Sequence, residues 1–242
     1  MKRFQLVSSL FIIATRTMAW RSSGSTNQEL VENLRRNRVF ASQRAYDAMI
    51  AVDRADFSPR DPYEDAPQRI GYNATISAPH MHAAALDYLQ NHLVAGANAL
   101  DVGSGSGYLT VCMAKMVGRT GVVVGIEHMP ELVELSRKNI KKNNSELIEN
   151  GNVIMVEGDG RQGFADKAPY NAIHVGAAAK GVPKALLDQL AEGGRMMIPV
   201  ENEDGNQVFM QIDKVNGKIE EKVVEHVIYV PLTSREKQWS HH

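Results

Sequence analysis

The sequence predicts an α/β fold with a doubly wound, mostly parallel sheet, an antiparallel C-terminal hairpin and an N-terminal helical extension. Two observations predict this class. From Ala99 onward, short apolar runs alternate with amphipathic stretches, the pattern of a parallel sheet with helices on both faces. In addition, the segment 99–110, ALDVGSGSGYLT, passes from an apolar run through three glycines at alternate positions into a second apolar pattern, which indicates strand, turn and helix.

The first elements of the chain are expected to be helical. Leu30, Val31 and Leu34 recur at helical spacing after Ser25 or Thr26, either of which can cap the helix. A second helix is expected over 42–53 and a third over 79–93, with proline at a first-turn position. Between them, prolines punctuate a long connection at 58–67, and a connection of that length in a compact domain is more often functional than idle.

The remaining elements follow the alternation of strand and helix. Strands are expected near 98–102, 121–127, 152–157, 170–176 and 194–199, and helices near 107–117, 130–144 and 182–191. The tail differs, because 207–214 and 218–231 are joined through Asn216-Gly217 and predict a hairpin.

Length, charge and cysteine content narrow the class of protein. The 242 residues fit one α/β domain with short additions. The 27 Lys and Arg balance 28 Asp and Glu, which argues against a broad basic surface for nucleic acid. The lone Cys112 excludes an intramolecular disulfide and a cysteine-cluster metal site, and its apolar neighbours favour buried packing.

The N-terminus has a basic flank, Lys2 and Arg3, and a short apolar run over 4–14 that Arg16 ends. This pattern is closer to a secretory signal or an anchor than to a spanning helix. We treat 1–17 as an extension outside the fold, either a targeting segment or an alternative start before Met18. Residues 18–242 are expected to form a single domain with a helical subregion at 25–93. The expected compartment is the cytoplasm, with a secretory or anchored form left open by 1–17.

Three successive strand ends carry residues suited to a nucleoside, and ligands of doubly wound sheets bind at the carboxyl ends of strands. The glycine turn follows the first strand. Glu127 ends the second, where a carboxylate can accept hydrogen bonds from ribose hydroxyls, the alternative being a solvated carboxylate. Asp159 stands between two glycines after the third, where it can accept from an adenine amino group or cap a turn.

The glycine spacing separates two kinds of nucleoside site. Tyr108 occupies the position of the third glycine of the dinucleotide fingerprint, whereas Gly-x-Gly-x-Gly is the form found at S-adenosylmethionine sites of Rossmann-like methyltransferases. No Gly-x-x-x-x-Gly-Lys-Ser/Thr loop is present, so nucleotide phosphoryl transfer is disfavoured.

Five segments together resemble the protein-L-isoaspartate (D-aspartate) O-methyltransferase family, over a region from about Met18 to Trp239. The glycine turn is shared by many methyltransferases, but the TISAPH segment upstream of it is specific to this family. The segments are TISAPHMH at 75–82, DVGSGSG at 101–107, EGDG at 157–160, AIHVGAA at 172–178 and YVPLT at 229–233.

This resemblance implies a Rossmann-like, S-adenosylmethionine-dependent methyltransferase fold. The implied reaction esterifies the α-carboxylate of L-isoaspartyl residues, and the side-chain carboxylate of D-aspartyl residues, and releases S-adenosylhomocysteine. The ester then collapses to a succinimide, whose hydrolysis returns some normal aspartate. The implied partners are damaged proteins and peptides, with no nucleic acid, no stable membrane association and a monomeric enzyme.

The resemblance also assigns site residues. Ser77 is similar to the family's active-site serine beside the acceptor carboxylate, and Thr233 and Gln238 resemble residues that close over the cofactor. No metal ligand is implied. The rest of the implied cofactor shell is Ala74, Thr75, Ile76, Ser77, His82, Gly103, Ser106, Glu127, His128, Asp159 and Gly160.

A modest set of residues suits this chemistry. A carboxylate is already ionised at neutral pH, so the acceptor needs no general base and Ser77 would hold it by a hydrogen bond. No Gly-x-Ser-x-Gly elbow surrounds Ser77, so a covalent role lacks support. The alternative role of Ser77 is that of a helix cap ahead of Pro79.

Other readings remain open. His80 and His82 are two residues apart, which separates them on a helix and disfavours a metal pair, and His174 suits a core or strand-end position with a supporting role. The chain could also be a methyltransferase for a small molecule or nucleic acid, although its Asp61-Pro62-Tyr63 lies upstream of the glycine turn and unlike an amino-methylating motif. A non-enzymatic domain that binds cofactor and a partner protein is the last alternative, and the intact Ser77 counts against it.

Overall fold

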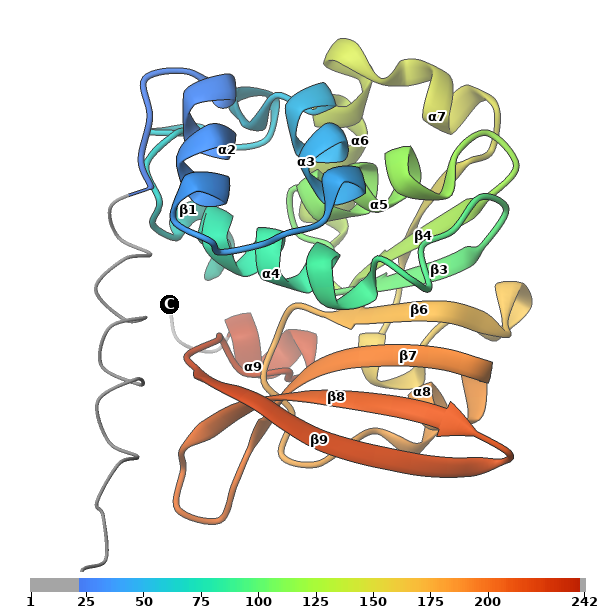
Figure 1. Ribbon diagram of the computed structural model, residues 1–242. Helices are drawn as coiled ribbons and strands as arrows, with labels where there is room; N and C mark the ends of the chain where they lie inside the picture. The colour runs from blue at the N-terminus through green and yellow to red at the C-terminus, as the bar shows by residue number, and fades with distance from the viewer. Residues whose placement is uncertain (1–21, 240–242) are drawn as a thin grey trace, which may run out of the picture.

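A seven-stranded mixed sheet forms the centre of the molecule (Figure 1). The computed structural model describes residues 22–239, so the expectations for 1–17 and for a start at Met18 lie outside the described residues. The strand order is β5-β4-β3-β6-β7-β8-β9, parallel through β7 and antiparallel beyond it. The strands are β3 (Asn98–Val102), β4 (Val122–Glu127), β5 (Val153–Glu157), β6 (Tyr170–Val175), β7 (Leu190–Glu201), β8 (Gln207–Val215) and β9 (Lys218–Val227).

Each central strand is buried on both faces, as its almost continuous apolar sequence predicts. Neighbouring residues point to opposite faces, so Val123 joins the larger core while Val124 joins the smaller one. The larger core lies under the helices that precede β6 in the chain, and the smaller core lies under α8 (Lys184–Gln189). The prediction of a doubly wound sheet with a C-terminal hairpin is therefore confirmed, with the helices divided unequally between the faces.

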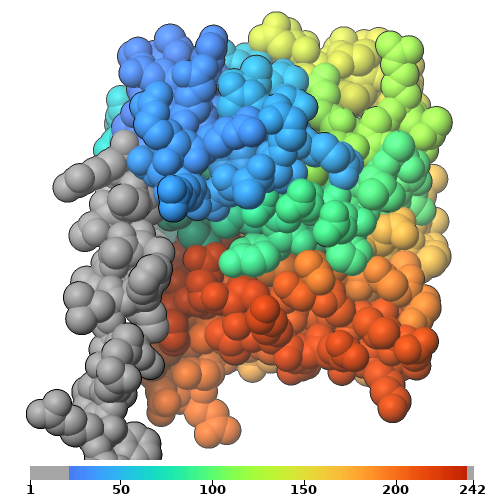
Figure 2. Space-filling view, viewed as in Figure 1, coloured from blue at the N-terminus to red at the C-terminus, as the bar shows by residue number. Residues whose placement is uncertain are grey.

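The N-terminal helices cover one face of the sheet. They are α2 (Asn27–Arg36), α3 (Gln43–Ala51) and α4 (Pro79–Leu89). Thr26, rather than Ser25, is the N-cap of α2, because its side chain accepts from the Glu29 N–H at 3.1 Å. Figure 2 shows the side chains of these helices above those of the C-terminal strands, and α4 packs against β7.

Two of these helices end earlier than the sequence predicts. The second ends at Ala51 instead of 53, because Val52 is extended and Asp53 caps the 3-10 turn η2 (Arg54–Asp56). The third ends at Leu89 instead of 93, although Leu93 is still fully buried. Apolar periodicity therefore continued into the turn beyond the helix and predicted too long an element.

The proline-punctuated connection leads into a hairpin that the sequence did not predict. Strand β1 (Gln68–Gly71) pairs antiparallel with β2 (Ala74–Ile76) through Tyr72 and Asn73, both of which have positive φ. These strands are short and irregularly paired, so period-two patterning is too weak to reveal them. The hairpin lies at the edge of the functional site described below.

The crossover elements agree with prediction except after β6. Helices α5 (Tyr108–Val117) and α6 (Pro130–Asn143) match, a short α7 (Ser145–Glu149) follows, and the 3-10 turns η3 (Gly160–Gln162) and η4 (Ala165–Lys167) connect β5 to β6. The predicted helix 182–191 was too long, because Leu190 already pairs with Tyr170 as the first residue of β7.

The tail makes the predicted hairpin and then returns across the molecule. Asn216 and Gly217 both have positive φ, which a tight hairpin turn requires. Strand β9 ends at Val227 instead of 231, because the next residues leave the sheet and Leu232 donates to the Ala178 carbonyl at 2.7 Å. Helix α9 (Arg235–Trp239) follows. No helix within 22–239 is long and apolar enough to cross a membrane.

Candidate functional site

The glycine turn after β3 is built from conformations that favour glycine. Gly103, Gly105 and Gly107 have φ of +73°, +50° and +87°. Gly107 is the N-cap of α5, so the first turn of that helix directs its N–H groups toward the carboxyl edge of the sheet. A Cβ on Gly103 would meet no protein atom within 4 Å, which leaves this side of the turn open.

Glu127, at the end of β4, fastens this turn to the next strand. The buried carboxylate accepts from the Gly105 N–H at 3.2 Å through Oε2. Its Oε1 accepts from the N–H groups of His128 at 2.8 Å and Met129 at 3.1 Å. The reading of Glu127 as a freely solvated carboxylate is therefore wrong, and its oxygens lie at the carboxyl edge of the sheet.

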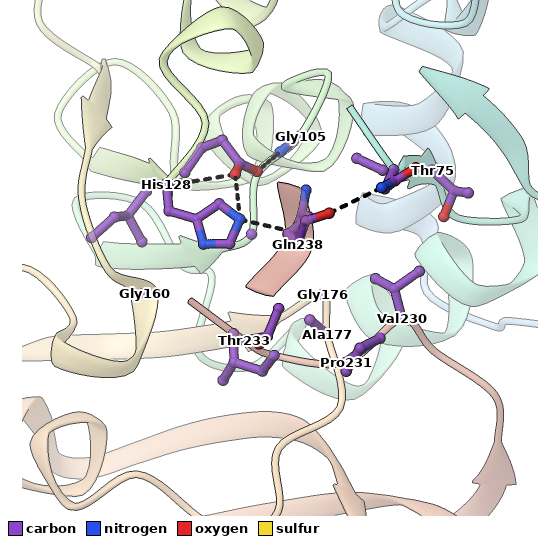
Figure 3. Close-up of a pocket in the computed structure, with 16 residues that line it drawn as sticks. Thr75, Gly105, His128, Gly160, Gly176, Ala177, Val230, Pro231, Thr233 and Gln238 are labelled. Carbon is purple, nitrogen blue, oxygen red and sulfur yellow. Dashed lines mark hydrogen bonds and ion pairs between the residues drawn. The ribbon is translucent and has the colours of Figure 1, made fainter. Parts of the chain in front are cut away.

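The C-terminal helix closes the site from the other side (Figure 3). His128 Nε2 donates to Gln238 Oε1 at 2.8 Å. Gln238 Nε2 donates to the Tyr72 carbonyl at 2.8 Å. Asn73 donates in turn to the backbone carbonyl of Gln238 at 2.9 Å. Gln238 therefore joins the end of β4 to the β1–β2 hairpin, segments far apart in the chain.

A pocket lies between these elements. The predicted residues that line it come from β2, the strand ends and the tail: Ala74, Thr75, Gly103, Glu127, His128, Gly160, Thr233 and Gln238. The sequence reasoning did not name the other lining residues individually, although Gly105 belongs to the predicted glycine turn and five more belong to the segments 172–178 and 229–233. They are Asn73, Gly105, Ile126, Gly176, Ala177, Val230, Pro231 and Leu232. Gly176 and Ala177 follow β6, so asking what ends the fourth parallel strand would have found them.

Five predicted residues do not line this pocket. Ile76, Ser106 and His82 are buried, and Ser77 is half-buried on the segment between β2 and α4. The alternative of Ser77 as a helix cap is wrong, because the N-cap of α4 is Ala78 and no side chain caps that helix. The fifth residue is Asp159.

Asp159 has the turn-capping role that was its alternative reading. It is the N-cap of η3 and accepts from the Arg161 N–H at 3.0 Å, while the Arg161 guanidinium pairs with both carboxylate oxygens. These hydrogen bonds lower the pKa of Asp159. An adenine amino group would share this carboxylate with Arg161.

The histidines occupy separate environments. His174, on β6, is buried and bonds Asp101 at 2.9 Å, and Thr110 donates to the same carboxylate at 2.6 Å. His80 bonds Asp65 at 2.8 Å. No cluster of three or more His, Cys, Asp or Glu among residues 22–239 could hold a metal ion. Cys112 is buried, as its apolar neighbours predict, and burial raises its pKa to about 12.

The pocket has the groups and the space that an adenosyl sulfonium requires. Glycine backbone without side-chain bulk allows close approach at Gly103. The Glu127 carboxylate accepts three backbone N–H groups, which leaves one lone pair on Oε2 for a ribose hydroxyl. No phosphate group has to be neutralised, which agrees with the scarcity of cationic side chains, since the lining residues include no Lys or Arg. The residues therefore fit S-adenosylmethionine.

Comparison with known proteins places the chain in a family. The model of the Protein-L-isoaspartate(D-aspartate) O-methyltransferase family matches residues 25–237. The chain is 85% identical to the Caenorhabditis elegans protein-L-isoaspartate O-methyltransferase over 92% of this chain and 99% of that protein. It is 49% identical to protein-L-isoaspartate O-methyltransferase 1 of Arabidopsis thaliana, over 90% of this chain and 95% of that one.

A solved structure shares the fold and carries a ligand. The Plasmodium falciparum protein-L-isoaspartate O-methyltransferase, in complex with S-adenosyl-L-homocysteine, superposes with a TM-score of 0.82 at 39% identity, covering 87% of this chain and 99% of that one. This agrees with the cofactor chemistry of the pocket. On the matched family model and these relatives, the chain belongs to the protein-L-isoaspartate (D-aspartate) O-methyltransferase family.

Proposed function

We propose that this chain transfers a methyl group from S-adenosylmethionine to the free α-carboxylate of L-isoaspartyl residues, and to the side-chain carboxylate of D-aspartyl residues, in damaged proteins and peptides. One observation carries the proposal. Ala74 and Thr75 line the pocket that ends in the glycine turn, and Ser77 lies two residues further along the same segment. The segment specific to the family thus borders the site whose chemistry suits the cofactor.

The proposed roles divide the site in two. Gly103, Glu127, His128 and Gly160 hold the adenosyl part, with Thr233 and Gln238 over it. The wider shell of Ala74, Thr75, Ile76, Ser77, His82, Ser106 and Asp159 remains a proposal drawn from the family motif. Ile76 and Ser106 are buried and do not line the pocket.

The chemistry asks little of the protein beyond alignment. S-adenosylmethionine supplies a methyl group already activated on a sulfonium. The acceptor carboxylate is ionised at neutral pH, so no side chain has to remove a proton. Ser77 donates a hydrogen bond to one carboxylate oxygen and leaves the other free to attack. Alignment alone is worth on the order of 7–11 kcal/mol, which is the major part of the rate gain expected here.

A pair of peptides tests this function directly. Labelled S-adenosylmethionine is incubated with the protein and with two peptides that differ only in Asp or isoaspartate at one position. We expect a base-labile methyl ester on the isoaspartyl peptide alone. Equal labelling of both peptides, or none, would contradict the proposed substrate, and labelling of nucleic acid or a small molecule would favour another methyltransferase class.

The partners and compartment are also proposed. The partners are proteins and peptides with isoaspartyl sites, met by a monomer without nucleic acid or stable membrane association, and the compartment is the cytoplasm. Sedimentation at micromolar concentration should give a single species near 26.7 kDa.

A further inference from the structure

Arg54 is a charged side chain in an unusual position. It begins the 3-10 turn η2 after α3, and it is 0% exposed, the largest fully buried side chain among the described residues. Removing a guanidinium from water costs several kcal/mol unless its surroundings compensate. Burial lowers the pKa of Arg54 to about 10, so the group is still protonated at neutral pH.

The guanidinium contacts both the segment that contains Ser77 and the first residue after the glycine turn. Its Nη2 donates to the Ser77 carbonyl at 2.6 Å, and its Nη1 lies 3.2 Å from His82 Nδ1. Its carbon atom lies 5.2 Å from the centre of the Tyr108 ring, a cation–π distance. Tyr108 is the first residue of α5, directly after the glycine turn.

The contact with His82 determines the state of that imidazole. Arginine nitrogens only donate hydrogen bonds, so His82 Nδ1 must accept and the ring proton must lie on Nε2. Burial and the positive charge of Arg54 lower the pKa of His82 well below its usual value. The other titratable groups that face His82 are His174 on β6 and His80 on the same helix, and the Tyr108 ring packs at 5.1 Å.

A neutral imidazole suits this position. The cofactor brings a positive sulfonium, and although His82 does not line the pocket, a buried histidinium on this helix would oppose that charge. On the acceptor side, the carboxylate loses its negative charge as the methyl group arrives. A cation bound directly to the carboxylate would stabilise the starting state more than the transition state. A neutral Nε2–H donor avoids both penalties.

We propose that Arg54 is a positioning residue of the methyl transfer, which holds the Ser77 carbonyl and keeps His82 in the Nε2–H tautomer. This inference rests on the proposed function of the segment that contains Ser77. Its effect is to set that segment against the glycine turn in a single arrangement before substrate binds.

Arg44 provides a matched control. It is a second arginine that is not fully exposed, and it donates to the carbonyls of Gln90 at 2.6 Å, Met116 at 2.8 Å and Leu93. These carbonyls lie at the ends of α4 and α5 and not in the site. Arg44→Lys should therefore lower the melting temperature while leaving the turnover number for an isoaspartyl peptide unchanged.

The test on the wild-type protein is spectroscopic. The ¹⁵N shifts of His82, assigned by their loss in His82→Gln, should show a neutral ring with its proton on Nε2 between about pH 5.5 and 8. A proton on Nδ1, or titration near the ordinary histidine pKa, would overturn the proposal. This measurement needs no turnover, so it remains decisive even if no ester forms on the isoaspartyl peptide, an outcome that would count against the proposed function instead.

The variants add a kinetic test. At saturating S-adenosylmethionine, Arg54→Met should lower the turnover number roughly 10- to 100-fold, as expected for misplaced reacting groups. It should also release the His82 tautomer, because Nδ1 loses the N–H that it accepts, and Arg54→Lys should restore part of the activity. The affinity for S-adenosylhomocysteine should fall less than turnover does. If Arg54→Met folds and keeps turnover within twofold, the proposal is wrong.

Discussion

At the residue scale, Glu127, which we propose binds the cofactor, also holds together the site around it. Its carboxylate accepts three backbone N–H groups, one from the glycine turn and two from the residues that follow β4. These bonds set the side chain in place before any ligand arrives. The ligand therefore meets an acceptor that is already ordered, which saves the entropy of fixing a long side chain on binding.

Ser77 gives the first residue-scale prediction. In the role proposed for Ser77, Ser77→Ala removes one hydrogen bond to a charged acceptor, so turnover with an isoaspartyl peptide should fall roughly 10- to 100-fold. Affinity for S-adenosylmethionine should remain within about twofold, because a side chain that holds only the acceptor adds little to cofactor binding. Calorimetry and initial rates measure the two quantities, with the exposed Ser25→Ala as control. Full turnover in Ser77→Ala would remove Ser77 from the mechanism.

His82 gives a prediction for the pH dependence of stability. Its pKa in the folded protein is well below the value of 6.5 that the unfolded chain has, because burial and Arg54 oppose its charge. The unfolded chain therefore binds the proton first. The contribution of His82 to the free energy of unfolding has its full value above about pH 6.5. Below that pH the free energy of unfolding declines by up to about 1.4 kcal/mol per pH unit because of this group.

Denaturant titrations between about pH 7 and 5 measure this slope. His82→Gln should make the decline shallower, whereas the exposed His226→Gln should leave it as in the wild type. An unchanged slope in His82→Gln would mean that His82 does not carry this pH dependence.

At the element scale, the glycine turn can be tested against a glycine of equal strain. Gly103 and Gly118 have φ of +73° and +68°, and a Cβ at either would meet no protein atom within 4 Å. Alanine at each should therefore cost roughly 1–2 kcal/mol of stability from backbone strain alone. Only Gly103 lines the pocket, so only Gly103→Ala should also weaken the binding of S-adenosylhomocysteine. Equal affinity in both variants would place the ligand elsewhere.

Helix α9 gives the second prediction at this scale. The Gln238 side chain bonds both His128 and the backbone of the β1–β2 hairpin. Gln238→Ala removes both bonds, each worth about 1 kcal/mol, so S-adenosylhomocysteine should dissociate roughly tenfold faster. Stopped-flow displacement measures this rate. In the His128→Ala background, the same change should have a smaller effect, and full additivity would show that the two side chains act independently.

At the scale of the whole molecule, the sequence revealed those site residues that can be recognised from their immediate neighbours in the chain. Gly103, Glu127 and Gly160 each lie at or just after the end of a strand, and parallel strands bring their carboxyl ends to one edge. Reading strand ends therefore found them without any knowledge of distant contacts. The order of strands and helices could be predicted for the same reason, because apolar periodicity depends only on neighbouring residues.

The parts that the sequence did not reveal depend on long-range packing. Arg54 stands among charged residues near a helix end, where its sequence context resembles a solvated surface, and only the fold shows it buried under Ser77 and His82. The bond from Gln238 to Tyr72 joins residues 166 positions apart. Burial of a charge and closure by a distant segment leave no periodic pattern in the chain. The tail residues Thr233 and Gln238 were therefore predicted only through the family resemblance.

The last prediction concerns the whole chain and its first residues. The family model begins at residue 25, and the pocket residues of the described chain lie between Asn73 and Gln238. If residues 18–242 form one domain, a variant that starts at Met18 should keep its melting temperature, its affinity for S-adenosylhomocysteine and its rate of ester formation on an isoaspartyl peptide. A reporter fused to the full chain and to this variant tests location separately, and a cytoplasmic signal from both is expected. A large loss of ester formation in the shorter variant would place 1–17 within the functional unit. A difference in location alone would make 1–17 a targeting segment, because the catalytic domain would then be complete without it.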